Sequence, residues 1–123
     1  MKNLILILFF GVLISCSQKK SEIRYMSLYS TTIKSINCND LLKSSQIKKL
    51  NLTDKKANEL VKIFSQLDPA DSGWKIDARV SGFIYDDSKK LNFCMSGIII
   101  DINGAKYFVN DNLRNQIIQI TNK

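Results

Sequence analysis

Apolar and polar residues alternate most regularly over residues 74–85 (WKIDARVSGFIY), and a period of two predicts a β-strand with two distinct faces. One face carries Trp74, Ile76, Ala78, Val80 and Ile84. The other face carries Lys75, Asp77, Arg79, Ser81, Phe83 and Tyr85. If helices cover one face of the resulting sheet, the aromatic side chains of the second face are left pointing outward.

Two tight turns continue this strand into an antiparallel meander. Residues 86–89 (DDSK) form the first turn, which places Asp86 opposite Lys89 and pairs opposite charges. Asn103-Gly104 forms the second, because both residues accept the positive φ of a type I′ hairpin. We expect a single central strand over residues 90–102 between the two turns.

The apolar positions of that central strand change face halfway along. Leu91, Phe93 and Met95 share one parity, whereas Ile98, Ile100 and Ile102 share the other. A β-bulge near Ser96-Gly97 would bring both sets to one side of the sheet, since glycine within a strand often marks a bulge. The alternative is a strand that is buried on both faces.

Two helices are predicted from apolar stripes with helical spacing. The first covers residues 53–67, with Thr53 as N-cap and residue 68 turned out of the helix by Pro69. The second covers residues 111–121, with Asn110 as cap. The stripes comprise Ala57, Leu60, Val61, Phe64 and Leu67 in the first helix, and Leu113, Ile117 and Ile120 in the second, with Ile118 beside it.

The segment before the first helix is less regular. Residues 23–36 are rich in Tyr, Thr and Ile and predict a strand. Residues 41–52 fit either a short helix capped by Asp40 or an irregular turn followed by a strand at residues 46–52, and we favour the turn and strand. The expected fold class is therefore α+β. It is a single domain over residues 23–123, a two-layer sandwich in which an antiparallel β-meander carries two helices on one face, in the order β-α-β-β-β-α.

The amino-terminal 16 residues have a different pattern. Lys2 precedes an unbroken apolar run over residues 4–14, which is too short to cross a membrane and fits a secretory signal. The run ends in Leu13-Ile14-Ser15-Cys16, which resembles the lipobox of small bacterial lipoproteins. The resemblance implies cleavage after residue 15 and lipid attachment at Cys16. Residues 17–22 (SQKKSE) are polar and lack apolar periodicity, so residues 16–22 are expected to be the lipidated cysteine and a flexible tether. Ser17, rather than Asp, follows the cysteine, and by the same resemblance this favours the outer membrane.

Charge and cysteine content fit an exported, membrane-anchored chain. The net charge of +7 is concentrated in residues 17–56, which suggests contact between this basic half and anionic headgroups or simply a solvated lysine-rich face. Once Cys16 is lipidated, Cys38 and Cys94 remain as a pair. They are either joined by a disulfide in an oxidising compartment or buried as free thiols. Export disfavours nucleic acid as a partner.

Candidate chemistry is sparse in this sequence. There is no histidine, so Ser-His and Cys-His nucleophile pairs are excluded, and no C-x-x-C or glycine-rich phosphate loop is present. We therefore expect no metal, no cofactor and no enzymatic activity. The expected role is a non-catalytic binding or inhibitory module that uses Arg79, Phe83 and Tyr85 to contact an envelope protein. The alternative is a structural envelope protein whose basic half contacts an anionic membrane or polymer. A third, less favoured option is an enzyme that works without histidine, from Asp, Lys, Tyr and Ser alone.

Overall fold

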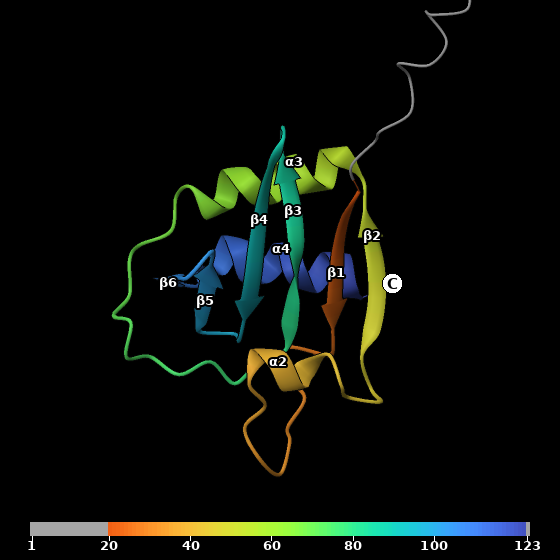
Figure 1. The fold of residues 1–123 in the computed structure, drawn as a ribbon, viewed down its shortest axis with the longest axis vertical. Helices are drawn as coiled ribbons and strands as arrows, with labels where there is room; N and C mark the ends of the chain where they lie inside the picture. The colour runs from red at the N-terminus through yellow and green to blue at the C-terminus, as the bar shows by residue number, and fades with distance from the viewer. Residues whose placement is uncertain (1–19, 123) are drawn as a thin grey trace, which may run out of the picture.

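The computed structural model describes residues 20–122, which form one six-stranded antiparallel sheet with three helices, an α+β fold with a meander (Figure 1). This confirms the expected fold class. The strands are β1 (Ser21–Tyr25), β2 (Lys48–Leu52), β3 (Val80–Asp86), β4 (Lys89–Met95), β5 (Ile99–Ile102) and β6 (Ala105–Phe108). The helices are α2 (Cys38–Leu41), α3 (Asp54–Phe64) and α4 (Asp111–Thr121). The strand order is β2-β1-β3-β4-β5-β6, so β1 lies between β2 and the meander.

The two longer helices cover one face of the sheet, which we call the core face. In Figure 1, α3 and α4 lie behind the strands. Both begin where the sequence places their caps: Thr53 Oγ1 accepts from the Lys56 amide, and Asn110 Oδ1 accepts from the Leu113 amide. The core between helices and sheet includes Ile23, Leu60, Phe64, Val80, Ile84, Phe93, Met95, Ile100, Leu113 and Ile117.

The prediction of one strand over residues 90–102 is wrong. β4 ends at Met95, and a turn at residues 96–98 reverses the chain into β5. Ser96 Oγ accepts hydrogen bonds from the amides of Ile98 and Ile99, both at 3.1 Å. The Ser96 side chain therefore closes a turn at the position where Ser96-Gly97 suggested a bulge.

This hairpin explains the change of parity. Phe93 lies opposite Ile102, and Met95 lies opposite Ile100. Because residues directly opposite one another in an antiparallel pair point to the same side, Ile100 and Ile102 reach the same core face as Phe93 and Met95 without a bulge. Ile98 is the exception, since it lies in the turn and is exposed.

Two other strand predictions are too long. The segment expected as a strand over residues 23–36 forms β1 only as far as Tyr25, and β1 begins at Ser21, inside the expected tether. Likewise, β3 begins at Val80 and not at residue 74. Residues 74–77 have strand-like alternation but no neighbouring strand to pair with, so the pattern alone overestimates the strand length. Residues 41–52 contain β2 as expected, while the short helix α2 precedes it and is capped by Asn37.

The second face of the sheet is only partly covered. At one end of this face lies α2, which is at the bottom of the view in Figure 1, next to the start of β3. A small core there comprises Met26, Leu41, Ala78 and Cys94 with Ile36, Ile47 and Ile76 against it. This third helix, on the face opposite α3 and α4, was not expected. The remainder of this face carries the outward side chains of β1, β3 and β4, and we call it the outer face.

The two edges of the sheet differ. The segment around Pro69 pairs with β6, because Phe108 donates to the Asp68 carbonyl and Ala70 donates to the Lys106 carbonyl. The opposite edge is β2, which carries exposed Lys48 and Lys49. Lysines on an edge strand oppose pairing with another chain.

A candidate binding groove

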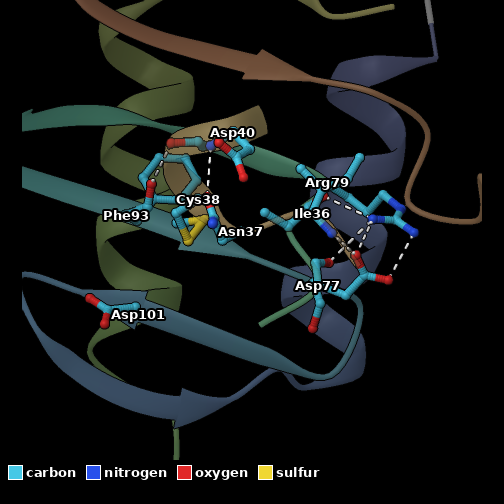
Figure 2. The surroundings of a disulfide bond; sticks show 12 residues. Ile36, Asn37, Cys38, Asp40, Asp77, Arg79, Phe93 and Asp101 are labelled. Atoms are coloured by element: carbon cyan, nitrogen blue, oxygen red, sulfur yellow. Dashed lines mark hydrogen bonds and ion pairs between the residues drawn. A yellow bond between two sulfur atoms is a disulfide. The ribbon is translucent and has the colours of Figure 1, made fainter. Parts of the chain in front are cut away.

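A disulfide fixes the segment between β1 and β2 to the outer face. The sulfur atoms of Cys38 and Cys94 are bonded, and the two Cα atoms are 6.0 Å apart, a separation that disulfides normally span (Figure 2). Cys38 opens α2, and Cys94 is buried in β4. The bond therefore attaches α2 to the carboxyl-terminal end of β4, an inner strand of the sheet, and the alternative of two free thiols does not hold in this structure.

A charged pair next to the disulfide holds the same segment. Asp77 and Arg79 form a two-pronged ion pair, with Nη1–Oδ1 at 2.8 Å and Nη2–Oδ2 at 3.0 Å (Figure 2). The Ile36 amide donates to Asp77 Oδ1 at 2.8 Å, while Arg79 also donates to the Ser30 carbonyl at 3.0 Å. The hydrogen bonds from Arg79, with that from the Ile36 amide, hold the pKa of the Asp77 carboxyl below its ordinary value.

This network corrects the expected role of Arg79. Arg79 is only 6% exposed. Its guanidinium group donates hydrogen bonds to Asp77, Thr32 and the carbonyls of Ser30 and Ala78. Phe83 is four residues further along the chain, about 13 Å away in an extended strand. Arg79 therefore anchors the loop over the sheet and does not share an exposed surface with Phe83 and Tyr85.

Phe83 and Tyr85 themselves remain on the outer face, half-buried. Their rings pack edge to face with centroids 5.8 Å apart, and Lys90 Nζ lies 4.4 Å from the Phe83 centroid. The structure thus keeps the two predicted aromatic residues together and gives them a cationic neighbour on β4.

A hollow that was not predicted lies at the end of the sheet opposite to Phe83 and Tyr85. It is a groove of about 480 Å³, within the size range of ligand-binding pockets. We define the groove by Leu28, Tyr29, Trp74, Lys75, Asp77, Arg79, Ser96, Gly97, Ile98, Ile99 and Arg114. Its walls come from four segments distant in sequence: the loop after β1, the loop before β3, the turn between β4 and β5, and Arg114 on α4.

Large apolar side chains are exposed along this groove. Tyr29 is 72% exposed, Ile98 is 61% exposed and Trp74 is 44% exposed. Phe108 packs edge to face against Trp74, with ring centroids 5.8 Å apart, and extends the apolar surface beyond the groove. Contiguous exposed apolar surface of this kind is typical of binding sites, whereas single exposed apolar residues are not informative.

The charges of the groove are largely neutralised within the protein. Arg79 pairs with Asp77, and Arg114 pairs with Asp111 while also donating to the Gly97 carbonyl at 2.9 Å. Lys75 is exposed at the rim. The groove therefore suits an apolar or aromatic group better than a phosphate or another strongly charged group.

Trp74 was expected on the buried face, and two contacts explain why it is exposed. Residues 71–74 form a turn closed by the Trp74 amide and the Asp71 carbonyl at 3.2 Å. Lys106 on β6 donates from Nζ to the carbonyls of Ser72 and Trp74 and so holds the turn at the edge of the sheet. The signal available in the sequence was the loop composition of residues 70–73 directly before Trp74.

The remaining sequence predictions concern residues or partners outside this geometry. Cys16, the expected lipid attachment site, lies outside the described residues. In residues 20–122, no cluster of three or more His, Cys, Asp or Glu side chains could hold a metal ion, and no helix is long and apolar enough to cross a membrane.

The chain matches no protein-family model, and comparison with curated proteins and with solved structures likewise finds no match.

Proposed function

We propose that the protein is a lipid-anchored, non-catalytic binding module of the bacterial cell envelope, held through Cys16 at the outer membrane. Its partner is an envelope protein that inserts an apolar or aromatic side chain into the groove. The observation that carries this proposal is the exposure of Tyr29, Trp74 and Ile98 around one hollow. Exposed aromatic residues beside a pocket are typical of interface hot spots.

Support also comes from how rigidly the groove is built. The loop that carries Tyr29 is held by the Arg79 bond to the Ser30 carbonyl, and the loop that carries Trp74 is held by Lys106. The disulfide joins Cys38, which follows the loop after β1, to Cys94 in β4 and limits the movement of that segment. A preformed site loses less conformational entropy when it binds than a flexible one does.

Two isoleucines offer a matched test of the groove. Ile98 lines it, whereas Ile33 is fully exposed but lies outside it. We expect Ile98→Ser and Trp74→Ala to abolish capture of a specific envelope protein by the full-length chain, and Ile33→Ser to leave capture unchanged. Capture would be followed by a saturable binding measurement with the purified partner, for which the fluorescence of Trp74, the single tryptophan, reports occupancy.

The outcomes separate the two roles considered from the sequence. Equal loss in Ile98→Ser and Ile33→Ser would contradict recognition through the groove. If neither the parent chain nor any variant captures a specific partner, the structural role is left, in which the basic half contacts an anionic membrane or polymer. Loss only in Phe83→Ala would move the binding site to the aromatic pair on the outer face.

A further inference from the structure

The aromatic pair on the outer face lies beside the residue at which the chain enters the sheet. Glu22 is opposite Phe83 in the β1–β3 pairing, and the Tyr85 amide donates to Ser21 Oγ at 3.0 Å. Cys16 is four residues before Lys20, and four residues reach at most about 14 Å when fully extended. A lipid at Cys16 therefore keeps Phe83 and Tyr85 close to the bilayer.

The side chains around this pair have the chemistry of a membrane interface. The outer-face region comprises Lys20, Arg24, Lys49 and Lys90 as cations and Glu22 as a carboxylate, with Asp87 in the adjoining turn, so positive charge is in excess. Asp86 and Lys89 pair with each other on the core-face side of the hairpin. Glu22 is largely neutralised, because Arg24 Nε lies 3.0 Å and Lys49 Nζ 3.7 Å from its carboxylate. Half-buried aromatic rings beside lysines suit the headgroup layer, where a ring is partly in acyl chains and an ammonium stays in water.

The groove lies at the opposite end of the sheet. Tyr29 follows the end of β1, and Arg79 directly precedes the start of β3. Residues 96–98 join β4 to β5 at the same end of the sheet. In Figure 1, β1 begins and β3 ends at the top of the view, whereas α2 and the loop after β1 lie at the bottom. The two surfaces are therefore separated by the length of the strands.

We infer that the outer-face region around Phe83, Tyr85 and Lys90 rests on the headgroups of an anionic lipid bilayer and directs the groove away from the membrane. This inference rests on the proposed lipid anchor at Cys16. Charge complementarity and the short chain between Cys16 and Ser21 select the bilayer as the occupant of this surface. A partner protein would then reach Trp74 from the aqueous side.

Tryptophan quenching by brominated lipids tests this orientation. The full-length lipidated protein is reconstituted into vesicles of phosphatidylethanolamine and phosphatidylglycerol with brominated acyl chains. Trp74 is the only tryptophan, so the native chain reports the groove end, and Phe83→Trp in a Trp74→Phe background reports the proposed membrane end. We expect several-fold stronger quenching of the reporter at position 83 than of native Trp74. Tyr85→Trp in the same background is a second reporter if the first variant does not fold.

A charge-reversal pair tests the electrostatic part. Lys20→Glu with Lys90→Glu is expected to reduce quenching of the position-83 reporter in phosphatidylglycerol vesicles. Lys34→Glu with Lys43→Glu places the same charge change on exposed lysines near α2 and is expected to leave quenching unaltered.

Failure of the anchor and failure of the orientation are distinguishable. Vesicle flotation is scored first: a chain that does not float with vesicles overturns the anchor and, with it, the orientation. A chain that floats but shows equal quenching at positions 74 and 83, or stronger quenching at 74, overturns the orientation alone. Equal effects of the two charge-reversal pairs would also overturn it.

Discussion

Removing the Cys38–Cys94 bond is the perturbation whose effect can best be worked out from the structure. The bonded residues are separated by 56 positions, so the unfolded chain is closed into a large loop. In the chain-entropy treatment, closing a loop of this length stabilises the folded state by about 4 kcal/mol. We therefore expect the double variant Cys38→Ala/Cys94→Ala to lose about that much free energy of unfolding. For a domain of this size, that loss corresponds to a thermal unfolding midpoint roughly 15–20 °C lower.

The assay is urea unfolding followed by circular dichroism, on the oxidised protein, the double variant and the oxidised protein treated with a dithiol reductant. Reduction should reproduce the effect of the double variant and should leave the variant itself unchanged. The slope of the free energy against urea should rise, because an uncrosslinked unfolded chain exposes more surface. A loss below about 1 kcal/mol would refute the chain-entropy reasoning for this loop. It would mean that the unfolded chain is held compact by other contacts.

Two further substitutions test specific contacts. Gly82→Ala places a Cβ 2.3 Å from the Glu22 carbonyl oxygen, so β1 must move; we expect a loss of about 2–3 kcal/mol by urea unfolding. Gly73→Ala, with no atom within 4 Å of the added Cβ, should stay within about 0.5 kcal/mol of the parent, and equal effects would argue against a clash. Asp77→Asn weakens the ion pair with buried Arg79 and is expected to cost about 1–2 kcal/mol at neutral pH, since Asp77 is partly solvated. The lowered pKa of Asp77 makes its contribution complete above the unfolded pKa of about 4. That contribution falls away as the pH drops through the lower folded pKa, so the difference in free energy of unfolding between Asp77→Asn and the parent should vanish in acid. A difference that stays constant with pH would refute the role of the Asp77 charge.

Local signals predicted the elements whose structure depends on neighbouring residues. The caps Thr53 and Asn110 and the hairpin at Asn103-Gly104 are governed by hydrogen bonds and backbone angles within a few residues. The pairing of Asp86 with Lys89 also follows from the turn alone. These features appear in the structure as predicted.

Features that depend on pairing partners were predicted less well. The alternation over residues 74–85 is real, but a strand requires a neighbour, and residues 74–77 have none. The parity change within residues 90–102 suggests either a bulge or a strand buried on both faces, but it arises from a turn at residues 96–98. That turn depends on the β4–β5 pairing and on the hydrogen bonds that Ser96 Oγ accepts from the Ile98 and Ile99 amides. Arg79 was placed on an exposed surface because its strand parity matched that of Phe83, although its charge is used internally.

The sequence by itself determined the α+β class, the two capped helices and two hairpin turns, because these rest on apolar periodicity and local backbone chemistry. It also predicts lipidation at Cys16, which lies in the short amino-terminal segment and does not depend on the fold. Only the tertiary structure decided that Cys38 meets Cys94, that Arg79 is buried, and that Tyr29, Trp74 and Ile98 line one groove. Those three outcomes join segments far apart in the chain, and the residues' local sequence carries no information about which distant segment they will meet.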